Sequence, residues 1–260
     1  MGHLRLGTLP TSKNWKEVVA LIPQPSSTPS QIAAATIEAA KGGVRRAAND
    51  NGVIDSFWLL TQIPLAARQE DFAEALRSLG LSVSNSPTAF DVLGALAQGI
   101  ETKIVQRRER SDFSELSLAA AQEALSELCI EETRGLFDAT SEDVKNSFRK
   151  YSTSAQFRRL ARAFFTGFTT RYLKTFLSRE LSNHVGAAEK FEDVRQHSEF
   201  NEALDRHCFE TSRVVEEFAG SWFSKTNFER GIDRDAVKGF LHVALQKIAE
   251  QLRRAGLENA

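Results

Sequence analysis

Residues 155–181 read AQFRRLARAFFTGFTTRYLKTFLSREL, and this stretch decides the fold class. Apolar side chains recur in it every three or four residues, and it contains no proline. Such spacing places one apolar stripe along an α-helix, which at 3.6 residues per turn continues for about seven turns. We therefore expect the longest helix of the chain here, with a stripe formed by Phe157, Leu160, Phe164, Phe168, Tyr172 and Phe176.

The rest of the chain continues the helical pattern. Its 260 residues include 15 glycines and 6 prolines, and 42% of them are hydrophobic. The alternating pattern of a β-strand is almost absent apart from His3–Leu6, where we expect an extended arm. The predicted fold class is therefore all-α: a mainly antiparallel multi-helix bundle with an extended N-terminal arm. This composition and a net charge of −1 exclude a disordered or a supercharged chain.

Proline and serine mark the expected domain organisation. Residues 23–30 are rich in both, which predicts a linker, so we assign residues 1–30 to the arm and linker. Residues 31–260 form the predicted helical domain. A second irregular stretch at residues 82–87 is a candidate boundary between two helical subdomains.

Short-range signals predict several helix ends. A helix that begins near Ser30 ends at Gly42-Gly43 or runs on past them. Asn51-Gly52 predicts a turn, because this dipeptide favours left-handed backbone conformations. Ser86-Pro87 predicts an N-cap followed by proline in the first turn of a helix. Thr226–Glu229 has the spacing of a capping box, which predicts the start of another helix.

Charge is segregated between Asp143 and Glu180, where nine bases and no acids occur. Cations interleaved with aromatic side chains are typical of surfaces that bind an anionic partner, either the phosphates of a nucleic acid or an anionic lipid. A phenylalanine stripe at core spacing argues against stacking on nucleic-acid bases. Alternatively, the nine acids of residues 189–217 neutralise the bases internally. The candidate anion-binding residues are Arg149, Lys150, Arg158, Arg159, Arg162, Arg171 and Lys174.

A second candidate surface lies in the aromatic segment 218–228. Gly220-Ser221 allows another backbone to approach closely, and the aromatic side chains around it suit an interface or a pocket. Packing inside the core is the alternative. The candidate interface or pocket residues are Phe218, Trp222, Phe223 and Phe228.

Motifs for catalysis, metals or cofactors are missing from the sequence. Its two cysteines, Cys129 and Cys208, form no CxxC pair, and its histidines show no metal-binding spacing such as HExxH. Phosphate-binding glycine loops are also absent. His207 and Cys208 are adjacent, but neighbouring residues of a helix point about 100° apart, which argues against a catalytic dyad. We therefore predict no catalytic residue, no metal site and no cofactor.

Two segments, GHLRLGTLP at residues 2–10 and HCFETSRVVEEFAGSWFSKTNFER at residues 207–230, resemble an uncharacterised bacterial protein family. The resemblance spans most of the chain. It implies a companion protein of a multi-gene bacterial system, with antiviral defence as a candidate role. It carries over no catalytic residue.

The functional hypothesis is a non-catalytic binding or adaptor subunit of a bacterial multi-protein system. In this hypothesis the basic and aromatic helix at 144–179 engages an anionic partner. The first alternative is a sensor of anionic lipid with an acyl-sized cavity lined by phenylalanines, and the second is a nucleic-acid-binding protein. The sparse cysteines suit a reducing cytoplasm, with peripheral association at the inner membrane under the lipid alternative. A protein partner is expected, no transmembrane segment is expected, and the oligomeric state stays open.

Overall fold

The computed structural model describes residues 12–133 and 140–258, and within them the fold is an all-α helical bundle, as predicted. The one β-like pairing recorded among these residues is an isolated bridge between Val185 and Phe191. The helices are α1 (Lys13–Leu21), α2 (Pro29–Ala39), α3 (Lys41–Ala47), α4 (Asn51–Ala66), α5 (Phe72–Ser78), α6 (Ala89–Arg107), α7 (Asp112–Thr133), α8 (Ser141–Lys150), α9 (Ser154–Ser182), α10 (Val194–Thr211), the 3-10 turn η1 (Ser212–Val215), α11 (Glu216–Glu229) and α12 (Arg234–Glu258).

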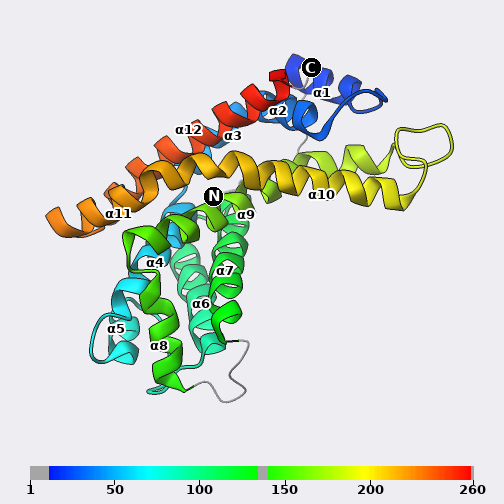
Figure 1. Ribbon diagram of the computed structural model, residues 1–260. Coiled ribbons are helices and arrows are strands. Elements are labelled where there is room, and N and C mark those ends of the chain that lie inside the picture. The colour runs from blue at the N-terminus through cyan, green and yellow to red at the C-terminus, as the bar shows by residue number, and fades with distance from the viewer. Residues whose placement is uncertain (1–11, 134–139, 259–260) are drawn as a thin grey trace.

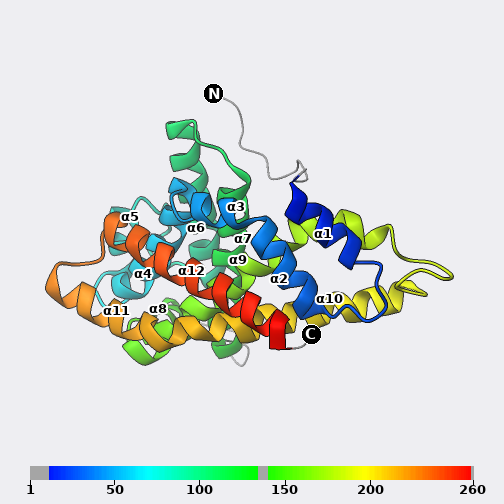
Figure 2. The same cartoon turned by 90° about the horizontal axis from the view of Figure 1, so that it is seen from above.

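Two groups of helices meet across α9. In Figure 1, α10 and α11 continue one another across the molecule, with α12 and α1 to α3 on one side of them. Helices α4 to α8 form a second group below, in which α6, α7 and α8 run steeply to that upper layer. Figure 2 shows α12 lying along α2 and α11 from above. Helix α9 packs against α7, α10 and α11, so it belongs to the interior of both groups.

The central helix α9 confirms the prediction for residues 155–181. It runs from Ser154 to Ser182, and the Thr153 side chain caps its start by accepting a hydrogen bond from the Gln156 amide. The whole predicted stripe is buried. Phe157 stacks on Phe223 of α11 at 4.0 Å between ring centroids, and Phe164 contacts Phe57 of α4 at 5.2 Å. The aromatic face of the helix therefore forms the hydrophobic core.

Part of the range expected as an arm and linker is helical. Residues 13–21 form α1, in which Trp15 and Val18 are buried, and Trp15 lies against Phe176 of α9. This part of the chain is therefore packed on the core and is not extended. The arm predicted at His3–Leu6 lies outside the described residues.

Three predicted helix ends are wrong. Asn51-Gly52 is the first turn of α4 and not a separate turn, because the Asp50 carboxylate caps the Gly52 and Val53 amides. Helix α6 is capped by Thr88 and not by Ser86, since Thr88 and Asp91 form a reciprocal capping box. Thr226–Glu229 is the last turn of α11 and opens no new helix.

Gly42-Gly43 lies inside a helix that is separate from α2. The helical path breaks at Ala40, and α3 then contains both glycines. The Tyr172 hydroxyl donates a hydrogen bond to the Ala40 carbonyl at 2.8 Å, and a Cβ atom at Gly43 would lie 2.1 Å from that hydroxyl. The missing side chain therefore allows α3 to pack closely on α9 at this break.

One hydrophobic cluster extends across the candidate boundary at residues 82–87. It includes Ile32 and Phe57 before this stretch and Phe164 and Leu241 after it. Helix α2 packs on α12, and α4 packs on α7 and α12. No helix in residues 12–133 and 140–258 combines the length and the apolar run needed to cross a bilayer.

Candidate functional site

The middle of the basic helix is largely neutralised by neighbouring helices. Arg171 binds Glu123 of α7 at 2.6 Å, and Lys174 binds Asp205 of α10 at 2.6 Å. Arg162 lies 3.4 Å from Glu216 of α11, donates to the Phe209 carbonyl at 3.0 Å and stacks on the Phe209 ring. These three cations therefore hold α9 to its neighbours. Asp205 and Glu216 belong to the acidic residues 189–217 that were expected to neutralise the basic segment, whereas Glu123 lies outside that range.

A groove of about 490 Å³ follows this paired region of α9, and we call it the α9 groove. Arg159, Arg162 and Arg171 line it. Its lining also includes four acids, namely Glu123, Glu127, Asp205 and Glu216. Because the acids offset the arginines, the α9 groove has no excess of positive charge to attract an anion.

A different pocket collects the cations at the start of the basic segment. This corner pocket, of about 590 Å³, lies where α8 turns into α9, and Arg68 reaches it from the end of α4. The described residues that line it include three cations and no acid: they are Arg68, Asn146, Arg149, Lys150, Ser152 and Thr153. Excess positive charge in a depression is the arrangement that concentrates anions.

Local structure fixes the floor of the corner pocket. The hydroxyls of Ser152 and Thr153 donate to the Arg149 and Lys150 carbonyls, which closes the last turn of α8. Helix α9 then begins at the pocket with no acid in its first turn, so the positive end of its dipole is not offset locally. Arg68 and Arg149 make no side-chain ion pair or hydrogen bond with any other described residue. Their guanidinium groups are exposed to solvent at the pocket.

The structure thus separates the seven predicted anion-binding residues. Arg149 and Lys150 come together in the corner pocket, while Arg159, Arg162 and Arg171 line the mixed-charge α9 groove. Lys174 is paired with Asp205, and Arg158 is exposed on α9. Sequence reasoning missed Arg68 and Asn146. The basic segment gave no sign of Arg68, which reaches the pocket from another helix.

The aromatic segment 218–228 mainly packs in the core. Phe223 is buried, and Trp222 stacks on Phe240 of α12 at 4.2 Å between centroids. Phe218 is half-buried and also contacts Phe240, at 5.4 Å. Phe228 alone of the four is exposed, with 91% of its surface accessible. A Cβ atom at Gly220 would lie 2.6 Å from the Ser154 carbonyl oxygen, so this glycine allows the close backbone approach expected here.

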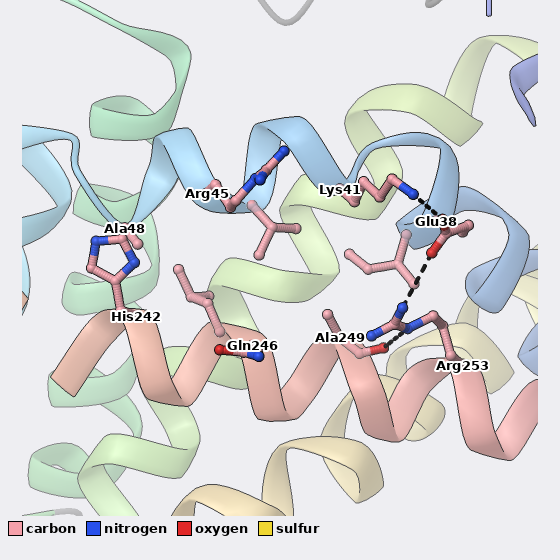
Figure 3. A pocket seen from close by; sticks show the side chains of 11 residues that line it. Glu38, Lys41, Arg45, Ala48, His242, Gln246, Ala249 and Arg253 are labelled. Atoms are coloured by element: carbon pink, nitrogen blue, oxygen red, sulfur yellow. Dashed lines mark hydrogen bonds and ion pairs between the residues drawn. The ribbon is translucent and has the colours of Figure 1, made fainter. Parts of the chain in front are cut away.

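A third hollow, the α3–α12 pocket, has a volume of about 380 Å³. Figure 3 shows Lys41 and Arg45 on α3 along one side and His242, Gln246 and Arg253 on α12 along the other. The rest of the lining is Glu38 and five apolar side chains: Ile37, Val44, Ala48, Leu245 and Ala249. Nothing in the sequence analysis pointed to this pocket, because its two walls are about two hundred residues apart in the chain.

The residues considered for catalysis are unsuited to it in this arrangement. Cys208 is fully buried, and burial raises the pKa of its thiol to about 11, which keeps the thiolate population low. Burial lowers the pKa of His207, whose Nε2 atom has no hydrogen-bond partner among the described residues. No group of three histidine, cysteine or acidic residues within the described ranges converges as metal ligands would.

Comparison with known proteins finds no match for this chain among protein families, curated proteins or solved structures.

Proposed function

We propose that this chain is a non-catalytic binding subunit that engages an acidic segment of a protein partner through the corner pocket. The observation that carries the proposal is the lining of this pocket, in which the exposed Arg68 and Arg149 meet and none of the described lining residues is an acid. The internal pairing of Arg162, Arg171 and Lys174 leaves this end of the basic segment as its anion-attracting part.

The chemistry of the lining suits carboxylates. The two guanidinium groups of Arg68 and Arg149 offer paired donors that match the two oxygens of a carboxylate. The hydroxyls and the Asn146 amide supply polar neighbours. Because the arginine side chains are exposed, each pair formed there contributes about 0.2–1 kcal/mol, so several acids of one segment are needed together.

Nucleic acid fits this surface less well than an acidic protein segment. Binding to a polynucleotide gains most from many phosphate contacts and from exposed aromatic rings on which bases stack. The corner pocket offers three cations, and the aromatic stripe of α9 is buried. The lipid alternative needs an acyl-sized cavity beside those phenylalanines. The recorded cavity beside Phe168 and Tyr172 measures about 10 Å³, far below the roughly 300–1,000 Å³ that is usual for ligand sites.

The companion role implied by the sequence resemblance is compatible with such a subunit. In a multi-gene bacterial system the partner would be another protein of that system, and it would present a cluster of Asp and Glu residues. Antiviral defence remains part of this proposal through the resemblance alone.

The test is a titration of the full chain into a fluorescein-labelled octaglutamate peptide, followed by fluorescence anisotropy at low salt. We expect saturable binding, and octaglutamine should not bind. The double variant Arg68→Gln/Arg149→Gln should weaken binding about tenfold, the effect of roughly 1.4 kcal/mol from two exposed pairs. Rising salt should weaken binding as well, because exposed charges are screened.

The matched control is Arg206→Gln/Arg230→Gln, which removes two exposed arginines outside the corner pocket. It should change the affinity less than twofold. Equal losses in the two double variants would reject the corner pocket as the site. Tighter binding of octathymidylate than of octaglutamate would favour the nucleic-acid alternative. Binding of phosphatidylglycerol vesicles, but not of phosphatidylcholine vesicles or octaglutamate, would favour the lipid alternative.

A further inference from the structure

The α3–α12 pocket lies beside two close helix contacts, one of α12 with α2 and one of α3 with α9. Near the C-terminus, α12 lies close to α2, where Gly256 would place a Cβ atom only 2.3 Å from that of Ala34. At the other end α3 is drawn toward α9, since Tyr172 binds the Ala40 carbonyl and fills the space beside Gly43. The break at Ala40 therefore opens a gap between α3 and α12, and this gap is the pocket.

The floor of the pocket is apolar and its rim is polar. Ile37, Ala48 and Leu245 are buried beneath it, with exposures of 4%, 1% and 5%. Figure 3 shows Gln246 near the middle of the opening and His242 at the end beside Ala48. A volume of about 380 Å³ lies within the range of roughly 300–1,000 Å³ that is usual for small-ligand sites. The shape and lining therefore suit a small molecule with an apolar body.

The charged side chains around the rim carry an excess of positive charge, which favours an anionic ligand. Glu38 is the one acid among the described residues that line the pocket, against Lys41, Arg45 and Arg253. Lys41 binds its carboxylate at 2.5 Å and Arg253 binds it at 3.3 Å, and the hydrogen bond from Lys41 lowers the pKa of that carboxyl. Figure 3 draws both contacts. Glu38 is thus already occupied by two cations at one end of the pocket.

Arg45 is the lining cation that does not contact Glu38. It is exposed on the last turn of α3, and its guanidinium makes no hydrogen bond or ion pair with other described residues. Its donors are available at a rim that carries three cations and one acid. An anionic group bound beside Arg45 would have a charged partner, while the rest of the ligand would cover the apolar floor.

We propose that the α3–α12 pocket binds a small organic anion with an apolar body, such as an aryl or alkyl carboxylate. The apolar part lies over Ile37, Leu245 and Ala249, and the anionic group lies beside Arg45. This site is separate from the corner pocket, which is lined by different residues of other helices.

The probe for the test is 2-naphthoate, titrated into the full chain by isothermal titration calorimetry. We expect one saturable site. The neutral analogue 2-naphthylmethanol, which keeps the apolar body, should bind about fivefold more weakly, which is the upper end of the range for an exposed ion pair. Equal affinity for the two probes would overturn the proposal, as would the absence of saturable naphthoate binding.

Neighbouring arginines of α3 provide a matched pair of variants. Arg45→Gln should weaken naphthoate binding about fivefold, whereas Arg46→Gln removes an exposed charge outside the pocket lining and should have less than a twofold effect. Ala249→Leu should weaken binding of both probes, because the larger side chain occupies part of the apolar floor, with an unchanged circular dichroism spectrum. Equal effects of the two arginine variants would overturn the assignment. Arg149→Gln should leave naphthoate binding intact, which separates this result from the fate of the proposed function.

Discussion

Asp55 is the buried charge on which several helices depend. Its side chain is 1% exposed, and its two oxygens accept hydrogen bonds from Arg107 of α6 at 2.5 Å and from Arg234 of α12 at 2.6 Å. Arg234 also stacks on Trp58, with its guanidinium carbon 4.3 Å from the ring centroid. One carboxylate on α4 therefore ties together three helices that are distant in sequence.

We expect Asp55→Asn to lower the free energy of unfolding by about 2 kcal/mol, because the buried side chain loses its charge and two half-exposed arginines lose their ionic partner. Urea denaturation followed by circular dichroism measures this change. Glu250→Gln is the control, since it breaks an exposed pair with Arg254 within α12 and should cost about 0.5 kcal/mol or less. If Asp55→Asn lowers the free energy of unfolding as little as Glu250→Gln does, the ion pairs of Asp55 contribute little to stability, because water replaces the carboxylate around the two arginines.

His207 makes stability depend on pH. Burial lowers the pKa of its imidazole below the ordinary value of 6.5, so the folded state resists a proton that the unfolded chain accepts. The free energy of unfolding therefore has its full value above the pKa that His207 has in the unfolded chain. It decreases as the pH falls below about 6.5, toward the lower pKa of the folded state.

Measuring the urea midpoint from about pH 7.5 to about pH 5 tests this dependence. The protein should lose stability toward the acidic end, and His207→Gln should lose less over the same range, because glutamine takes up no proton. Parallel curves for the two proteins would mean that other groups carry the pH dependence.

Contact between α9 and α11 depends on the absence of a side chain at Gly220. A Cβ atom there would meet backbone and side-chain atoms of Ser154 at 2.6–3.3 Å, and backbone cannot move aside cheaply. We expect Gly220→Ala to lower the free energy of unfolding by about 2 kcal/mol through overpacking.

Gly239→Ala is the matched control on α12, because a Cβ atom there meets nothing within 4 Å. It should raise stability by up to about 1 kcal/mol, since alanine favours helix over glycine. Thermal and urea unfolding of both variants would decide the point. If both substitutions stabilise the protein, α11 is free to shift away from α9.

At the level of elements, apolar periodicity predicts the helices well and local capping signals predict their ends less well. The pattern at residues 155–181 places α9 within one residue at each end, because an apolar stripe of this length fits no other structure. Asn51-Gly52 misleads because the dipeptide favours a turn in isolation, while the Asp50 side chain satisfies the first amides of a helix there. Ser86-Pro87 misleads because the Thr88–Asp91 capping box two residues later competes with it.

The candidate sites were predictable only where their residues are neighbours in sequence. Arg149 and Lys150 are adjacent, so the basic segment identified them together. The acid that neutralises Arg171 lies 48 residues earlier, and the arginine that completes the corner pocket comes from another helix. Charge pairing between helices depends on packing, which periodicity alone does not specify. The α3–α12 pocket escaped prediction for the same reason.

At the scale of the whole molecule, the continuous core predicts one cooperative unfolding transition. Helices that precede residues 82–87 pack on helices that follow them, with α2 on α12 and α4 on α7. The chain before this stretch and the chain after it therefore cannot each bury their apolar faces alone. Trp15, Trp58 and Trp222 lie on α1, α4 and α11, and their fluorescence therefore reports on both sides of the candidate boundary. Tryptophan fluorescence and circular dichroism should give the same urea midpoint. Two separate midpoints would instead establish a subdivision near residues 82–87, with the contacts between its parts contributing little to stability.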